Sequence, residues 1–264
     1  MFYIDTHAHL FLEQFDNDRE QVVKNAIKQG VGKIILPNVD LSTMEPMLEL
    51  SKKFPKVCYP AAGIHPTSVK ENYLEKIEKI KQWIKKEEFI AIGEIGLDLY
   101  WDKNYLEQQK KGFKLQLEMA KENQLPVIIH TRESFDETIN ILSESADPSL
   151  MGVFHSFTGN LIQAKQIMEY GFMIGINGIV TFKNAGLDKV VKEIDLDYLL
   201  LETDSPYLAP VPKRGKRNES SYLISIAEKI ASLKNITMDE LAEITTRNAR
   251  KLFFRSGKYG NEHF

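Results

Sequence analysis

The chain begins Met1-Phe2-Tyr3-Ile4-Asp5-Thr6-His7-Ala8-His9-Leu10, an apolar run that turns polar after Ile4. Its β-prone apolar part predicts a buried strand. Successive side chains on a strand point to opposite faces, so His7 and His9 point the same way. Two imidazoles on one face can bind a single metal ion. A pair of hydrogen-bonded histidines at a strand end is the alternative.

Seven further stretches repeat this pattern of an apolar run that ends in polar residues. They cover residues 31–37, 57–64, 89–95, 127–131, 152–157, 172–177 and 198–203. Segments with helical periodicity separate them, which is typical of a parallel sheet covered on both faces. Eight such units in 264 residues predict a closed (β/α)8 barrel, with residues 1–264 as a single domain. A doubly wound open sheet is the alternative, but no glycine-rich phosphate loop follows the first run.

Three short patterns predict where helices begin. Residues 17–20 and 42–45 resemble capping boxes, as do Thr237 and Glu240. In such a box, the first and fourth residues satisfy each other's backbone N–H groups. We expect helices to follow at all three places.

The composition is that of an ordinary soluble globular protein, with 43% hydrophobic and 27% charged residues. The single cysteine, Cys58, excludes an internal disulfide framework and fits a reducing compartment. No charged leader and no membrane-spanning apolar run is seen, so we expect a cytoplasmic protein without membrane contact. No pattern indicates an obligate protein partner. The net charge of −3 lacks the basic excess of most nucleic-acid binders, so contact with phosphates would require metal ions or a local basic patch.

Side chains that bind metal ions recur where the predicted strands end. They comprise five of the six histidines and two acids: His7, His9, His65, His130, His155, Glu94 and Asp204. In a (β/α)8 barrel, these strand ends surround one mouth, where active sites are found. Buried imidazoles and carboxylates are costly unless they are paired or bound to metal, so packing does not explain the whole set. We predict a metal site there. The sixth histidine, His263, lies in a polar tail.

The number of ligands suggests two divalent ions. One partial shell contains His7, His9 and Asp204, a second contains His130 and His155, and Glu94 is placed to bridge them. Such ions, ~3.5–4 Å apart, lower the pKa of a shared water and make a hydroxide nucleophile available near neutral pH. Imidazole and carboxylate ligands suit Zn²⁺ or Mn²⁺, and suit Mg²⁺ less well.

Several motifs spread over the whole chain combine into a specific pattern. They are Asp5-Thr6-His7-Ala8-His9, Gly63-Ile64-His65-Pro66, Gly93-Glu94-Ile95-Gly96-Leu97-Asp98, Ile129-His130-Thr131-Arg132, His155-Ser156-Phe157-Thr158-Gly159 and Glu202-Thr203-Asp204-Ser205-Pro206. With residues 214–219 and 246–249, they resemble the TatD family of metal-dependent deoxyribonucleases. The resemblance implies an amidohydrolase-type (β/α)8 barrel that hydrolyses phosphodiester bonds in DNA, with exonuclease action as the expected mode. Action on RNA remains open.

The resemblance also implies roles for individual residues. The implied metal ligands are His7, His9, Glu94, His130, His155 and Asp204. His65 would lie in the pocket near the scissile phosphate. Asp204 would receive the proton of the attacking water, or would act as a ligand only. Ser156 and Ser220 depart from the family pattern, at positions where cysteine and proline are often found, and neither touches a proposed ligand.

Other residues near the strand ends are candidates for substrate contact. Arg132 shares strand parity with His130, so it is placed to clamp a phosphate oxygen or to pair with a nearby acid. Arg214 and Arg217 belong to a basic run after the eighth strand, which fits phosphate contact or a solvated face.

Two aromatic residues and one acid complete this set. Tyr100 and Trp101 follow the fourth strand and can stack a base or pack their loop. Glu202 shares parity with Asp204 and can orient a ligand histidine or His65.

Two other functions fit the same pattern. A binuclear amidohydrolase would act on an amide, lactone or ester, including an aminoacyl-tRNA ester. Many such enzymes bridge their ions with a carboxylated lysine, whereas this chain offers Glu94, which favours a phosphodiester substrate. A catalytically idle barrel is the third possibility, and the intact ligand set argues against it.

Overall fold

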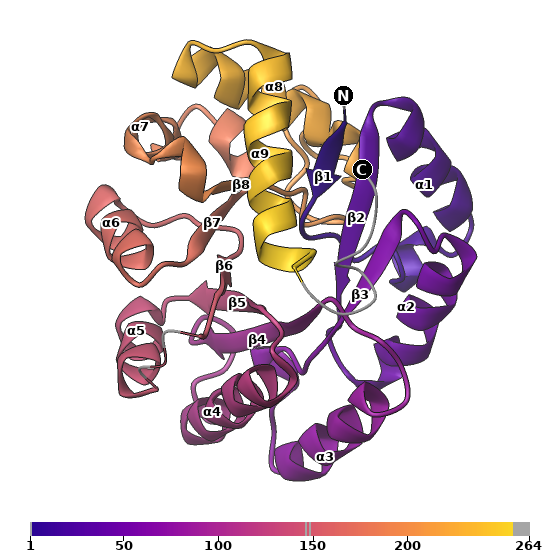
Figure 1. The fold of residues 1–264 in the computed structure, drawn as a ribbon, viewed down its shortest axis with the longest axis vertical. Helices are drawn as coiled ribbons and strands as arrows, with labels where there is room; N and C mark the ends of the chain where they lie inside the picture. The colour runs from indigo at the N-terminus through magenta and orange to yellow at the C-terminus, as the bar shows by residue number, and fades with distance from the viewer. Residues whose placement is uncertain (1, 146, 148, 256–264) are drawn as a thin grey trace.

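Eight parallel strands form the centre of the molecule in the computed structural model, which describes residues 2–145, 147 and 149–255 (Figure 1). The strands are β1 (Tyr3–Asp5), β2 (Val31–Pro37), β3 (Cys58–Ala62), β4 (Ala91–Asp98), β5 (Val127–Arg132), β6 (Gly152–Phe154), β7 (Met173–Ile176) and β8 (Leu199–Leu201). Each strand pairs with the next one along the chain. The predicted (β/α)8 fold is confirmed, whereas the assignment of residues 1–264 to a single domain stays a prediction.

The two edges of the sheet meet just beyond β1 and β8. The backbone N–H of Thr6 donates to the carbonyl of Leu201 at 3.0 Å, and that of Asp204 donates to the carbonyl of His7 at 2.8 Å. The N–H of His9 then donates to the carbonyl of Ser205 at 2.7 Å. Backbone pairing therefore continues between the ends of the two strands and brings His7, His9 and Asp204 together.

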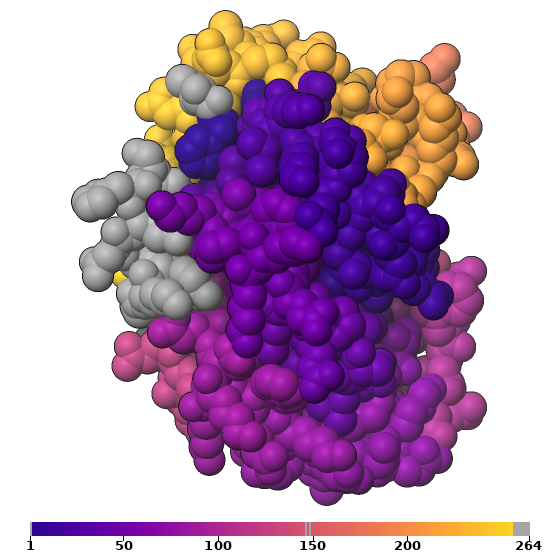
Figure 2. All heavy atoms as spheres, turned by 90° about the vertical axis from the view of Figure 1, so that its right-hand side faces the viewer, coloured from indigo at the N-terminus to yellow at the C-terminus, as the bar shows by residue number. Residues whose placement is uncertain are grey.

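Helices surround the strands on the outside, as Figure 1 shows. They are α1 (Arg19–Lys28), α2 (Leu41–Lys53), α3 (Tyr73–Ile84), α4 (Leu106–Asn123), α5 (Phe135–Glu144), α6 (Leu161–Glu169), α7 (Leu187–Glu193), α8 (Leu223–Lys234) and α9 (Met238–Phe253). Short 3₁₀ turns are η1 (Glu13–Phe15), η2 (Pro66–Ser68), η3 (Gly178–Thr181), η4 (Leu196–Tyr198) and η5 (Ser220–Tyr222). From the side of α1 to α3, side chains hide the strands (Figure 2). Within the described residues, no helix has the length and apolar character needed to cross a membrane.

Every second side chain of each strand points into the barrel. These side chains form an inner core below the mouth. Ile128 and Val153 belong to one buried cluster with Leu200. Because side chains two residues apart share a face, the next inward positions on β5 and after β6 are His130 and His155. The apolar floor of the barrel therefore gives way to imidazoles at its carboxyl end.

Two of the three predicted capping boxes are wrong. The residue before α1 is Asp18, which makes no side-chain cap bond because its carboxylate binds Arg217 instead. At α2, the box is formed by Asp40 and Thr43, two residues earlier than predicted. The box of Thr237 and Glu240 at α9 is confirmed.

Candidate metal centre

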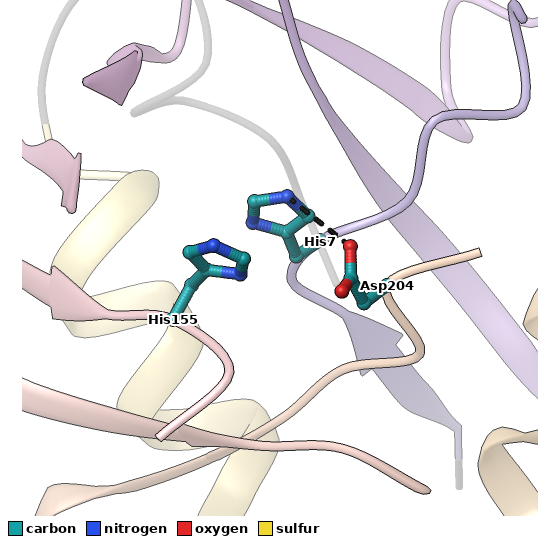
Figure 3. Close-up of side chains that lie close together, drawn as sticks. All are labelled: His7, His155 and Asp204. Carbon is teal, nitrogen blue, oxygen red and sulfur yellow. Dashed lines mark ion pairs between the residues drawn. The ribbon is translucent and has the colours of Figure 1, made fainter. Parts of the chain in front are cut away.

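The six predicted metal ligands lie together at the carboxyl ends of the strands. They come from β1 (His7 and His9, just beyond its end), β4 (Glu94), β5 (His130) and the residues after β6 (His155) and β8 (Asp204). Figure 3 shows His7, His155 and Asp204 from three separate strand ends. The rings of His7 and His155 stack with centroids 3.8 Å apart, and His7 Nε2 lies 3.9 Å from Asp204 Oδ1. His263 lies outside the described residues.

Four donor atoms form a first cluster. The Nε2 atoms of His7 and His9 are 3.0 Å apart, and they lie 3.2 and 3.5 Å from Glu94 Oε2. Asp204 Oδ1 is 3.6 Å from His9 Nε2. Donors around a tetrahedral zinc ion with bonds of ~2.0–2.1 Å lie ~3.3 Å apart. The spacing of this cluster therefore fits a single divalent ion.

The tautomer of His9 suits this role. Its Nδ1 lies 3.0 Å from the carbonyl oxygen of Pro37, and a carbonyl only accepts, so Nδ1 carries the proton. The lone pair then lies on Nε2, which faces the cluster. Backbone carbonyls orient metal-binding histidines in this way in many proteins.

A second cluster forms around the other oxygen of Glu94. Oε1 lies 2.6 Å from His155 Nε2 and 2.9 Å from His130 Nδ1, and these two nitrogens are 3.3 Å apart. His130 Nε2 donates to Asp98 Oδ2 at 2.9 Å. Burial lowers the pKa of His130, but its hydrogen bonds to Asp98 and to Glu94 raise that pKa above its usual value. A metal ion would displace the proton that Nδ1 directs at Glu94 and bind the lone pair. The donor set again fits a metal ion.

Glu94 connects the two clusters, since Oε2 faces one and Oε1 faces the other. The side chain is buried, with 2% exposure. Burial by itself would raise the pKa of Glu94, but the surrounding histidines, His155 foremost, hold that pKa well below its usual range. A bridging ligand must be ionised and must turn its two oxygens to different sets of donor atoms. Glu94 meets both requirements.

His65 lies beside the second cluster with a different protonation pattern. Its Nε2 is 3.3 Å from Glu94 Oε1. Its Nδ1 accepts the backbone N–H of Thr67 at 3.2 Å, so the ring proton is on Nε2. A protonated nitrogen donates hydrogen bonds and does not bind metal. This geometry suits a pocket residue better than a ligand.

Burial and charge shift the pKa values of the other ligands in opposite directions. Burial raises the pKa of Asp204 to about 8, with Glu94 and Glu202 adding to the rise and His155 opposing it. Burial alone would lower the pKa of His155, but Glu94 and Glu202 raise it well above its usual range. Burial lowers the pKa of His9 to about 4. At neutral pH, protons therefore reside on His155 and Asp204.

The backbone at Asp204 is also unusual. Its φ of 57° places it in the left-handed region, which non-glycine residues rarely adopt. Such conformations are enriched at functional sites, where the surrounding structure enforces them. Here Asn218 fixes the flanking backbone, because its side-chain amide donates to the carbonyls of Thr203 and Tyr207 at 2.8 and 2.6 Å.

Glu202 lies behind His155, fully buried. Its Oε1 accepts the backbone N–H of Ser156 at 2.5 Å and lies 3.7 Å from His155 Nδ1, beyond hydrogen-bonding distance. Within the described part of the chain, Glu202 Oε2 and His155 Nδ1 have no hydrogen-bond partner. A buried carboxylate and a buried imidazole thus lie close together.

The three arginines predicted to contact substrate each contact another side chain of the protein. The exposed Arg132 stacks its guanidinium on Tyr100, 3.7 Å from the ring centroid. The exposed Arg214 lies over Phe182 at 4.5 Å. Arg217 binds both carboxylate oxygens of Asp18, at 2.8 and 2.7 Å. Phosphate binding by these arginines stays a prediction.

Two buried acids near the centre were not identified from the sequence as site residues. Asp98 shares strand parity with Glu94 on β4, and this signal could have identified it as a partner of His130. Asp5 accepts the backbone N–H and the hydroxyl of Thr203 at 2.9 and 2.7 Å, and so fastens the end of β1 to β8. A polar residue at the end of an apolar strand was its only sequence signal.

Comparisons with known proteins identify the family of this chain. The model of the TatD related DNase family matches residues 4–254, which include every residue of both clusters. YabD of Bacillus subtilis (strain 168), an uncharacterized metal-dependent hydrolase, is 43% identical over 250 residues, covering 94% of this chain and 98% of that protein. The 3'-5' ssDNA/RNA exonuclease TatD of Erwinia tasmaniensis is 33% identical over 255 residues, covering 94% and 98%. The crystal structure of YJJV, a TatD homolog from Escherichia coli K12, has a TM-score of 0.89 at 31% identity, covering 95% and 97%.

Proposed function

Because the chain belongs to the TatD family of metal-dependent hydrolases, we propose that it hydrolyses phosphodiester bonds in DNA with two divalent metal ions, as an exonuclease. The relative from Erwinia tasmaniensis that is named as an exonuclease supports this substrate class, and leaves RNA as a further substrate. The observation that carries the proposal is the carboxylate of Glu94, whose two oxygens face two different sets of histidine nitrogens.

Both metal ions would be held by the residues of the two clusters. His7, His9 and Asp204 would hold one ion, His130 and His155 the other, and Glu94 would contact both. This mixture of imidazole and carboxylate suits Zn²⁺ or Mn²⁺ better than Mg²⁺. Bound divalent ions supply a nucleophile from water near neutral pH and neutralise charge on the phosphate.

The remaining steps fall to side chains of the chain itself. Asp204 takes the proton that the attacking water loses, because its carboxylate lies at the centre and loses its own proton when the ions bind. His65 directs its Nε2–H toward the centre and donates to a phosphate oxygen. Arg132 and Arg214, both exposed, and Arg217 at the edge of the mouth contact phosphates further along the strand.

Turnover of end-labelled DNA tests the proposal. The protein is stripped of metal, reconstituted with Zn²⁺, Mn²⁺ or Mg²⁺, and incubated with single- and double-stranded DNA. The expected result is metal-dependent product that shortens by single nucleotides from one end. The His130→Ala variant should lose it, and the His263→Ala variant, which removes a histidine that is not among the proposed ligands, should keep it. Intact DNA together with turnover of an amide or lactone would assign the centre to the amidohydrolase alternative.

A further inference from the structure

Two aromatic side chains and an arginine form an exposed group beside the metal centre. Tyr100 and Trp101, just after β4, are 50% and 69% exposed. Their rings meet edge to face with centroids 5.0 Å apart, and the Arg132 guanidinium covers Tyr100 at 3.7 Å. Arg132 lies 5.5 Å from the Trp101 ring centroid. We call these three residues the stacking platform. Their exposure argues against packing of the loop as their purpose.

The stacking platform is fixed to the metal centre through Asp98. Oδ1 of this carboxylate accepts the backbone N–H groups of Tyr100 and Trp101 at 3.0 and 3.1 Å. Its Oδ2 accepts the Nε2–H of His130 at 2.9 Å. Asp98 itself is 1% exposed and so has little freedom to move. One buried carboxylate therefore sets the position of a metal-binding histidine and of the exposed aromatic pair.

We propose that the stacking platform is a subsite for an unpaired nucleobase of the DNA strand whose phosphate is at the metal centre. This inference rests on the proposed function. Every base offers a π-face, so stacking on Trp101 requires no particular sequence. Arg132 adds positive charge close to the phosphates and holds Tyr100 by a cation–π contact.

This subsite selects the strand state of the substrate. Bases inside a duplex are already stacked on their neighbours, so they reach Trp101 only after unpairing. A single strand or a frayed end can offer its base at once. The stacking platform thus favours single-stranded DNA and contributes mainly to substrate affinity, while the metal centre performs the cleavage.

A binding experiment tests the subsite without relying on turnover. The sequence contains two tryptophans, and Trp83 is partly buried in α3, so Trp83→Phe leaves Trp101 as the single tryptophan reporter. Metal-loaded protein is titrated with a cleavage-resistant phosphorothioate oligothymidylate and with an equally long phosphorothioate chain of abasic tetrahydrofuran residues. Quenching of Trp101 by the first and weaker binding of the second are expected. Equal affinity without quenching would overturn the proposal.

Kinetics separate the subsite from the reaction. Trp101→Ala should raise KM for single-stranded DNA about 5- to 100-fold with kcat within about twofold, and Trp101→Phe should restore most of the affinity. Blunt duplex DNA should show no such change. The matched control is Tyr170→Ala, since Tyr170 is 39% exposed and follows α6, at the end of the barrel opposite the mouth.

The two proposals fail in different ways. If Trp101→Ala and Tyr170→Ala give the same KM while DNA is cleaved, the subsite is wrong and the phosphodiesterase stands. If the wild-type protein cleaves no DNA, the proposed function is wrong. In that case, absence of Trp101 quenching by the oligothymidylate also overturns the subsite, whereas quenching supports it as a base-binding site.

Discussion

Asp98 accepts the Nε2–H of His130 at 2.9 Å and thereby aims Nδ1 of that histidine at Glu94 Oε1, 2.9 Å away. A histidine can bind a metal ion only through a nitrogen that carries no proton, so this hydrogen bond selects the ligand atom. Asp98 also accepts two backbone N–H groups of the following loop. Loss of the Asp98 charge should therefore weaken metal binding at the second donor cluster before it lowers the stability of the fold.

The Asp98→Asn variant should bind metal at the second cluster about 10- to 100-fold more weakly. With its carbonyl on the two backbone N–H groups, asparagine would present its NH₂ to His130 Nε2 and move the ring proton to Nδ1. Metal titration by isothermal calorimetry measures the loss. Asp102→Asn is the matched control, because Asp102 lies in the same loop and binds Lys70 at 3.2 Å. Unchanged metal affinity in Asp98→Asn would refute the assigned tautomer.

Metal affinity should rise as the pH increases from 6 to 8. The pKa of His155 lies well above its usual range, and that of Asp204 is raised to about 8, so both groups hold protons at pH 7. An ion must displace these protons, and each one displaced weakens binding about tenfold per unit of decreasing pH below the group's pKa. Calorimetry in buffers with different ionisation enthalpies counts the protons released. The same Kd at pH 6 and pH 8 would contradict these assignments.

Removal of metal should lower the thermal stability of the protein. An ion that binds only the folded chain stabilises it by about 2.7 kcal/mol at a free concentration 100 times its Kd. For a chain of this size, that corresponds to a fall in Tm on the order of 5–10 °C when a chelator is added. Differential scanning calorimetry with Zn²⁺ and with chelator measures the difference. The His130→Ala variant should show a smaller fall in Tm when the chelator is added. If the Tm of the wild-type protein does not change with the chelator, the protein does not bind the ions as proposed.

The role of Arg217 can be separated from its ion pair with Asp18. The pair is about one-third exposed on the arginine side, so it should contribute no more than about 1 kcal/mol to the free energy of unfolding. Arg217→Ala and Asp18→Ala should lower stability by similar amounts, as chemical denaturation would show. Contact with a phosphate predicts a higher KM for Arg217→Ala only. If both variants keep the wild-type KM, Arg217 is a structural residue that joins the loop after β8 to the start of α1.

The fold could be read from the sequence because its strands are short apolar runs that end in polar side chains. Runs such as 31–37 can be buried on both faces only in a parallel sheet under helices. The order of the strands follows from the short connections between them. The positions of His130 and His155 follow from alternation, since they stand two residues beyond the inward-facing Ile128 and Val153.

Features that depend on residues far apart in the sequence were harder to predict from the sequence. Asp18 fails as a cap because Arg217, remote in sequence, binds its carboxylate. The proton positions on His65 and His9 are set by Thr67 and by the carbonyl of Pro37. The division of Glu94 between two histidine pairs depends on how four strand ends approach one another, which periodicity alone does not give.

The proposed function depends on two ions that share the carboxylate of Glu94. Crystals grown with Mn²⁺ or Zn²⁺, with data collected at the absorption edge of that metal, test it most directly through anomalous scattering. We expect two peaks ~3.5–4 Å apart, one beside His7 and His9 and one beside His130 and His155, with a Glu94 oxygen on each. A single peak, or two peaks of which only one contacts Glu94, would contradict it.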